Sequence, residues 1–184
     1  MEMLSTNEWK RPMYFATTVG SDYHLGLDPY LELTGMAYRI TPTRSADGRP
    51  RVNTEVMYDN MMNKFRYGNV NKPGIYLDEN TLRMCRTHRM MFSELAEALY
   101  EEGKHDKAIA VLDYAEEMLP GYNVSYDYTS ASMAALYYTL GEMEKGNAIM
   151  DQVATNAVEY MEWGTTLEPA SRKAAQSTLG HYSA

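Results

Sequence analysis

The sequence is short of the features that mark several classes of protein. It has one cysteine, Cys85, which excludes an internal disulfide and a cysteine-rich zinc site. No apolar run approaches the roughly 18 residues that a membrane span requires. The first residues also lack the long apolar core of a signal peptide. As given, the chain is therefore expected to be soluble and to contain no membrane span.

Positive charge is scarce as well. The sequence has 17 Lys and Arg against 25 Asp and Glu, which gives a net charge of −8 at pH 7, and it has no run rich in Lys or Arg. A nucleic-acid-binding protein needs a basic patch to contact phosphates. We therefore expect no nucleic-acid partner.

Catalytic motifs are missing too. The sequence has no GxSxG, phosphate loop or dinucleotide fingerprint, and its four histidines form no HExxH motif. Asp22, His24 and Asp28 are the one candidate acid/base or metal cluster, and a loop hydrogen-bond network is the interpretation that we favour for them. We expect no catalytic residue, no metal and no cofactor.

Methionine and tyrosine, in contrast, are abundant, with 15 and 16 copies. Methionine fills irregular gaps between helices, and tyrosine has an apolar ring with a polar tip. Packing in a helical core explains most of these residues without a ligand.

The first third of the chain has the pattern of β-strands. Residues 13–19 are rich in aromatic and β-branched residues, and residues 30–40 are a second candidate strand. In one continuous strand, Leu31 and Leu33 would point to one face, whereas the apolar residues after Gly35 would point to the other face. A bulge at Gly35 would re-aim the side chains, so we predict one bulged strand there. Strands should be confined to about residues 12–42.

Helices are predicted from Asn53 onward. Asn53 is a suitable N-cap for a helix that Gly68 would stop, and residues 69–80 form a loop with a turn at Pro73 and Gly74. From Thr81 onward every long segment has the pattern of a helix.

The strongest internal signal is a helix hairpin. In the first copy, Ala96 and Ala108 let two helices approach closely, Gly103 permits the turn and Asp106 is the expected cap of the second helix. The whole pattern resembles a tetratricopeptide hairpin. It comprises Phe92, Leu95, Ala96, Leu99, Gly103, Ala108, Leu112, Ala115 and Pro120.

The pattern recurs 38 residues later, as Met133, Ala134, Tyr137, Gly141, Gly146 and Met150. The second helix of this copy should run on towards Trp163. A last helix should open at Glu168 and Pro169, end near Gly180 and cover the open face of the second hairpin.

The predicted fold class is therefore mainly α, with tetratricopeptide-like helical hairpins (an α-α superhelix) and a small N-terminal β-hairpin layer. We expect residues 1–184 to form a single domain. Within it, residues 1–52 contain the strands, residues 53–80 form a helix and a loop, and residues 81–184 form the tetratricopeptide-like helical region.

Tetratricopeptide geometry also predicts a groove between the first helices of the two hairpins, for a protein or peptide partner. The alternative is that the N-terminal layer or the last helix fills this groove and buries its tyrosines. The predicted groove-facing residues are Met90, Ser93, Glu97 and Tyr100, with Tyr128, Ala131, Ala135 and Tyr138 as their equivalents.

Trp9 and Arg11 form a second candidate motif, because they can stack on one another or Arg11 can bind a carboxylate. The alternative is an aromatic anchor that fixes the start of the first strand.

Several segments in fixed order carry a resemblance to a known family. They are NEWKRPMYFA at 7–16, GSD at 20–22, LGLDPYL at 25–31, GMAYR at 35–39, VNTEVMYDN at 52–60, NKF at 63–65 and YLDEN at 76–80. Together they resemble the C-terminal soluble region of a bacterial family of multi-spanning membrane proteins of unknown function, distantly like the protein O-mannosyltransferases. The resemblance covers nearly the whole chain and is densest from residue 7 to about 120.

This resemblance implies a tail that is cut out of a longer membrane protein and lies on the periplasmic side. The glycosyltransferase-like part of that family is its membrane-embedded region, so no catalytic residue is carried over. We therefore expect a non-catalytic accessory domain, whose partners are a protein or peptide and the membrane-embedded part of its own parent chain. One alternative is a carbohydrate-binding module that uses exposed Trp and Tyr. The other is a free-standing enzyme that uses the loop of Asp22, His24 and Asp28.

Overall fold

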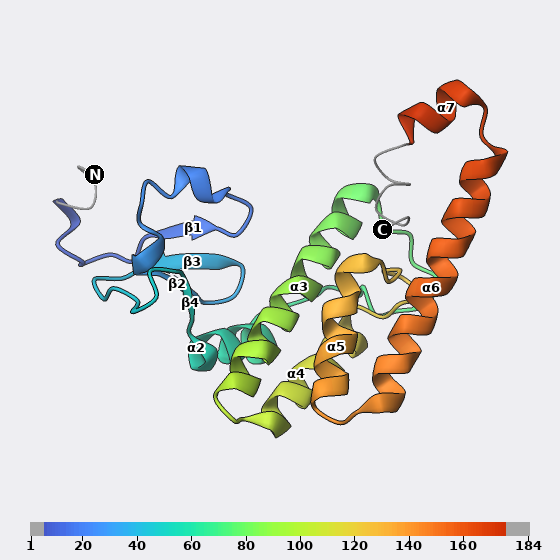
Figure 1. The fold of residues 1–184 in the computed structure, drawn as a ribbon. Helices are drawn as coiled ribbons and strands as arrows, with labels where there is room; N and C mark the ends of the chain where they lie inside the picture. The colour runs from blue at the N-terminus through green and yellow to red at the C-terminus, as the bar shows by residue number, and fades with distance from the viewer. Residues whose placement is uncertain (1–5, 176–184) are drawn as a thin grey trace. The chain divides into compact units, whose positions relative to one another are not determined.

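Strands occupy the first part of the chain and helices the remainder (Figure 1). The structure is a computed structural model that describes residues 6–175. The contacts of the chain divide it into two units, residues 1–66 and residues 67–184. The expectation of a single integrated domain stays a prediction.

The first unit is built on a small mixed sheet. Its strands are β1 Tyr14–Ala16, β2 Leu31–Leu33, β3 Ala37–Ile40 and β4 Arg51–Val52, in the order β1-β3-β2-β4. The β1/β3 and β2/β3 pairs are antiparallel, and β4 lies parallel to β2. Two short 3₁₀ turns, η1 Ser21–Tyr23 and η2 Asp28–Tyr30, connect β1 to β2. Leu31, Leu33 and Ile40 are buried on the sheet.

The prediction of one bulged strand over residues 30–40 is wrong, because the chain reverses at Gly35. Leu33 of β2 pairs with Tyr38 of β3, and the N–H and hydroxyl of Thr34 both donate to the carbonyl of Ala37. Gly35 has a φ of +139°, and a Cβ there would lie 2.9 Å from the ring of Phe65. The change of phase in the sequence therefore marks a hairpin turn between two strands.

The predicted limit of the strands at residue 42 is also wrong, because β4 lies beyond it. This strand has only two residues, too few for a pattern of alternation. Its position depends on a side-chain pair, in which Nε of Arg51 donates to Glu32 Oε1 on β2 over 3.0 Å.

The first helical segment begins as predicted and ends earlier. It consists of α2 Thr54–Tyr58 and a π-helical turn, η3 Asp59–Lys64, and Asn53 accepts a hydrogen bond from the N–H of Val56 as its cap. The helix ends at Phe65, whose backbone is extended, and not at Gly68 as expected. The amide of Asn60 donates to the carbonyl of Thr34 over 2.7 Å, so this segment is fastened to the hairpin turn.

The second unit contains the two predicted helix hairpins. Its helices are α3 Glu79–Glu101, α4 His105–Met118, α5 Ala131–Thr139 and α6 Met143–Thr166. The α3/α4 and α5/α6 pairs pack against each other (Figure 1), and Gly103 and Gly141 turn the chain with φ values of +74° and +85°. The mainly helical fold class is therefore confirmed, with paired helices and a small N-terminal sheet. No strand lies between Leu95 and Pro120, a range that the structure describes in full.

The core of the hairpins contains the small residues that the pattern placed there. Ala96 and Ala108 are both fully buried. Other buried apolar residues of this core are Phe92, Leu95, Leu99, Val111, Leu112, Ala115, Met133, Ala134, Tyr137 and Ile149.

The start of α4 differs from the prediction. Asp106 was expected to cap this helix, but α4 begins at His105 and follows Lys104, so Asp106 lies in its first turn. An acidic residue at this position still interacts favourably with the helix dipole. In α3 the cap is Asp78, which accepts a hydrogen bond from the N–H of Thr81.

The last described helix, α7 Pro169–Ala174, opens at Glu168 and Pro169 as predicted. Arg172 donates to the carbonyls of Gly164, Thr165 and Leu167, so the described part of this helix closes the end of α6. Its predicted end near Gly180 lies outside the described residues. Among residues 6–175, no helix is long and apolar enough to cross a membrane.

Candidate functional site

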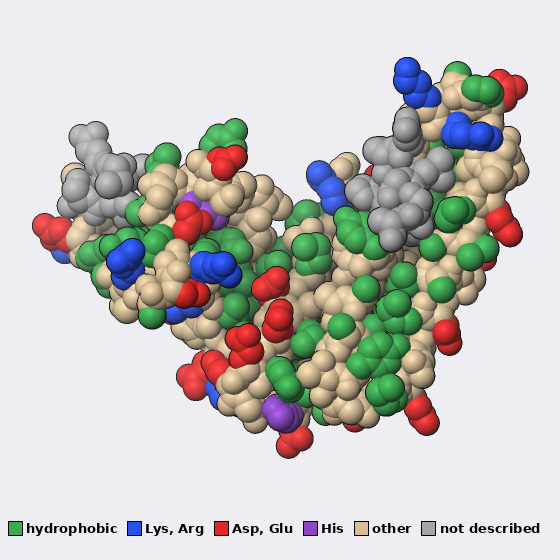
Figure 2. Space-filling model, in the orientation of Figure 1, with side chains coloured by type: hydrophobic (Ala, Val, Ile, Leu, Met, Phe, Trp, Pro, Cys, Tyr) green, Lys and Arg blue, Asp and Glu red, His purple; other side chains and the backbone are tan. Residues whose placement is uncertain are grey.

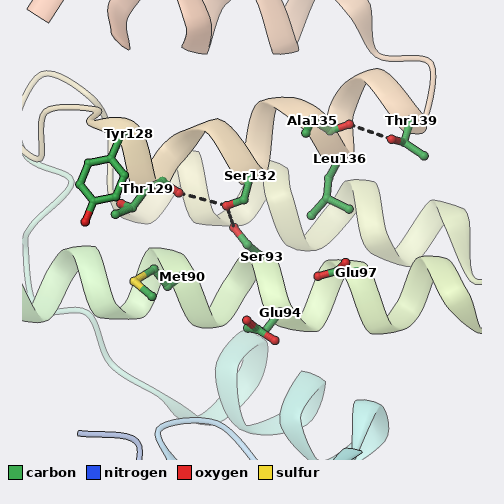
Figure 3. A pocket seen from close by; sticks show the side chains of 10 residues that line it. All are labelled: Met90, Ser93, Glu94, Glu97, Tyr128, Thr129, Ser132, Ala135, Leu136 and Thr139. Carbon is green, nitrogen blue, oxygen red and sulfur yellow. Dashed lines mark hydrogen bonds between the residues drawn. The ribbon is translucent and has the colours of Figure 1, made fainter. Parts of the chain in front are cut away.

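A groove of about 540 Å³ lies between α3 and α5, the first helices of the two hairpins (Figure 3). The wall from α3 carries an apolar, a small polar and two acidic residues, and the wall from α5 and the turn before it is mostly hydroxyl and small apolar. The lining residues are Met90, Ser93, Glu94 and Glu97 on one side and Tyr128, Thr129, Ser132, Ala135, Leu136 and Thr139 on the other.

Helical spacing explains why these side chains share one surface. The α3 residues recur at intervals of three and four, which places them on a single face of the helix. Ser93 and Ser132 join the two walls, because the hydroxyl of Ser132 donates to Oγ of Ser93 over 3.4 Å and to the carbonyl of Thr129 over 3.0 Å. Both side chains are small, so they form a floor on which a ligand can lie.

Five of the eight predicted groove residues line this groove, and they are Met90, Ser93, Glu97, Tyr128 and Ala135. Met90 and Tyr128 are 44% and 54% exposed, so neither side chain is buried as core. The alternative that another part of the chain fills the groove and buries its tyrosines is therefore wrong for Tyr128.

Tyr100, Tyr138 and Ala131 do not line the groove, contrary to prediction. The ring of Tyr100 stacks on His105, with 5.0 Å between centroids. The ring of Tyr138 lies over Gly146, and its hydroxyl donates to Asn147 over 3.0 Å.

For the two residues of α5, the cause is a shift of one residue in the register between the two hairpins. The 38-residue repeat places Ala131 opposite Ser93, whereas the structure places Ser132 there. One residue corresponds to about 100° of rotation on an α-helix. That rotation turns Tyr138 away from the groove and towards α6.

The groove carries negative charge without a cation of its own. None of its ten lining residues is Lys, Arg or His. Glu94 and Glu97 are exposed, and neither forms an ion pair with any of the described residues. Partial burial and the nearby charge of Glu97 raise the pKa of Glu94 above its ordinary value. Figure 2 shows acidic side chains along the C-terminal half of α3.

A buried arginine, which the sequence analysis did not single out, holds the connection that leads to Tyr128. Arg89 is 2% exposed and lies 4.4 Å from the ring centre of Tyr126. Its Nη2 donates to the carbonyls of Leu119 and Val124 over 2.7 and 2.6 Å. Its Nη1 donates to the carbonyl of Ser125 and the hydroxyl of Ser130, both over 3.3 Å. The sequence does contain a sign of its burial. Arg89 comes four residues after Cys85 and three before Phe92, so it lies on the apolar face of α3.

Asp127 completes this connection. It caps the 3₁₀ turn η4 Tyr128–Ser130 by accepting from the N–H of Thr129 over 3.0 Å. Arg86 lies 3.4 Å from its other carboxylate oxygen. These contacts hold Asp127 in place. Tyr128 is the next residue, so its exposed ring is positioned at the groove.

Trp9 and Arg11 lie on a tight turn before β1. The side chain of Asn7 accepts from the N–H of Arg11 over 3.2 Å and donates to its carbonyl over 2.6 Å. Glu8 and Trp9 have positive φ values of 45° and 59°. Trp9 is 52% exposed, so it is directed outward at the start of the sheet.

The structure brings together two of the three residues of the Asp22, His24 and Asp28 cluster. Nδ1 of His24 lies 2.8 Å from Asp28, and the buried imidazole packs on the rings of Phe15 and Tyr38. Its Nε2 is shielded from solvent and has no hydrogen-bond partner among residues 6–175. Asp22 is exposed. Residues 6–175 contain no group of three or more His, Cys, Asp or Glu arranged to hold a metal ion.

Comparison with known proteins links the first unit to a membrane protein family. Residues 1–60 match the family model described as TMEM260-associated domain 2. TMEM260 is a family of membrane proteins with a relation to glycosyltransferases. No curated protein matches the chain, and no solved structure does. The match covers the sheet and α2, and the groove lies outside it.

Proposed function

We propose that this chain is a non-catalytic accessory region of a membrane glycosyltransferase-like protein and that its groove binds a protein or peptide partner. The observation that carries the proposal is the groove itself, which is lined from the first helices of both hairpins and has an exposed aromatic side chain at one end. Paired helices commonly present peptide-binding surfaces in this way. The match of residues 1–60 supports the link to a membrane protein.

The parent protein, in this proposal, holds the groove on the periplasmic side of the membrane. A partner bound there would be an acceptor protein or a peptide segment of the membrane-embedded part of the same protein. Catalysis would belong to the membrane-embedded part. The shielded Nε2 of His24 supports this division, since a general base must reach the proton that it abstracts.

Titration of the ¹⁵N-labelled chain with short unstructured peptides tests the proposal. Four peptides of matched length would be used, one basic, one acidic, one neutral and polar, and one apolar. We expect at least one of them to shift the amide signals of α3 and α5 on the groove side, and Tyr128→Ala to weaken that binding.

Tyr76→Ala is the matched control, because Tyr76 is 91% exposed and lies outside the groove. Binding of none of the four peptides at millimolar concentration would contradict the proposal. Equal losses in the Tyr128 and Tyr76 variants would do the same.

A carbohydrate-binding role is the second candidate, and one observation favours it. Tyr160 and Trp163 on α6 are 38% and 48% exposed, their ring centres are 5.9 Å apart, and with Glu159 they line a cavity of about 190 Å³. The rings are nearly perpendicular, so only one of them can stack flat on a sugar. Quenching of tryptophan fluorescence by neutral oligosaccharides, lost in Trp163→Phe and kept in Trp9→Phe, would support this role.

A further inference from the structure

The two ends of the groove differ in chemistry. Met90 and Tyr128 lie together at one end, and Glu97 lies at the other (Figure 3). Between them are the hydroxyls of Ser93 and Ser132, which donate within the chain and can still accept hydrogen bonds from the N–H groups of a peptide.

The acidic end lacks a positive partner among the described residues of this chain. Glu94 and Glu97 are three residues apart on one helix face, where like charges repel each other. A ligand that brings a cation to this point would relieve the repulsion, and an acidic ligand would increase it. Charge complementarity therefore decides which class of peptide the groove accepts.

We infer that the groove selects an extended basic peptide, with an apolar or aromatic residue against Met90 and Tyr128 and a Lys or Arg between Glu94 and Glu97. This inference rests on the proposed peptide-binding function and adds the chemistry of the partner.

The length of the groove sets the spacing of the two side chains. Met90 and Glu97 are separated by seven residues of α3, which correspond to roughly 10 Å along the helix axis. A peptide in the extended polyproline II conformation rises about 3.1 Å per residue with three residues per turn, so side chains three positions apart point to the same side. The basic residue therefore lies three positions from the apolar one.

Labelled peptides of twelve residues in a Gly/Ser host provide the test, with one Phe and one Arg three positions later. A second peptide carries Glu in place of Arg, and a third has Arg directly after Phe. Fluorescence polarisation with the full chain should give a Kd for the first peptide at least about tenfold lower than for the second. The third should bind more weakly than the first. The preference should shrink at about 1 M ionic strength, where exposed charges are screened.

Variants of the chain assign this preference to the acidic end. Glu94→Gln and Glu97→Gln should each weaken binding of the first peptide by about threefold to fivefold, in the range of an exposed ion pair. Glu101→Gln is the control, because Glu101 is exposed at the end of the same helix and outside the groove. Circular dichroism of each variant would check that its fold is kept.

The outcomes separate this inference from the function on which it rests. If the Glu peptide binds as well as the Arg peptide, and Tyr128→Ala weakens both, the groove binds peptides without the inferred charge preference, and the inference is overturned alone. If none of the peptides binds, the proposed function fails together with it.

Discussion

Arg89 shows how one buried charge can order a connection between two hairpins. Burial lowers the pKa of its guanidinium, yet the group remains charged at neutral pH because the ordinary value is so high. Its hydrogen bonds to three backbone carbonyls and one hydroxyl replace water as partners. These bonds fix the segment from Leu119 to Ser130, which would otherwise leave buried carbonyl groups without donors.

Arg89→Met should therefore destabilise the chain strongly. The methionine fills much of the same space but donates no hydrogen bond, and the cost should be about 3 kcal/mol or more of unfolding free energy. Urea denaturation followed by circular dichroism measures this cost. Arg83→Met on the exposed side of the same helix should change stability by less than about 0.5 kcal/mol. Equal effects at the two sites would show that Arg89 has no special role.

Glu116, on α4, makes the stability depend on pH in a predictable direction. Burial raises the pKa of its carboxyl group, and the nearby Asp113 adds to the rise. A group with a raised pKa in the folded state stabilises the fold at low pH, and this contribution is lost as the pH rises through the folded value. Glu116→Gln should therefore raise the melting temperature at neutral pH.

The advantage of Glu116→Gln should disappear below about pH 4.5, the ordinary pKa of glutamate, where the wild-type side chain is also neutral. Thermal melts between pH 4 and pH 8 would show it. Glu117→Gln on the exposed side of α4 is the matched control. A stabilising effect of Glu116→Gln that is the same at every pH would contradict this explanation.

The helix hairpins depend on close approach at small residues. Ala96 and Ala108 are fully buried, which allows α3 and α4 to pack closely. Gly146 has the same role between α5 and α6, because a Cβ there would lie 2.4 Å from the ring of Tyr138. Both contacts leave no room for a longer side chain.

Ala108→Leu should accordingly overpack the first hairpin and cost on the order of 1–3 kcal/mol. Ala110 lies on the exposed side of the same helix, so Ala110→Leu should be close to neutral. Thermal melts of the two variants make the comparison. An unchanged melting temperature in Ala108→Leu would mean that this residue does not lie at the contact between the helices.

The whole chain has two sets of internal contacts, one in residues 1–66 and one in residues 67–184. The second unit has a buried core with apolar residues from α3, α4, α5 and α6, and these four helices pack on one another.

A chain that starts at Tyr67 should therefore fold by itself. We expect it to keep a helical circular dichroism spectrum and a cooperative thermal transition, because its four main helices pack on one another. A broad, non-cooperative transition would show instead that the hairpins require residues 1–66, as expected of a single integrated domain.

Local chemistry in the sequence determined the positions of the helices and of their turns. Gly103 and Gly141 adopt positive φ values, which other residues avoid, so their positions between apolar periodic segments predicted both hairpins. Asn53 predicted a helix start for the same kind of reason, since its side chain accepts from a nearby N–H. The candidate groove followed from these elements, and five of its eight predicted residues lie there.

Contacts between segments that are distant in the sequence decided how α5 is rotated and where the strand β4 forms. The helix α5 follows the connection that Arg89 and Asp127 hold, and its rotation places Ser132, not Ala131, beside Ser93. The two-residue strand β4 exists because it pairs with β2 and because Arg51 meets Glu32. The periodicity of a sequence shows which face of a helix is apolar. The direction in which that face points relative to another helix is fixed by packing between segments far apart in the sequence.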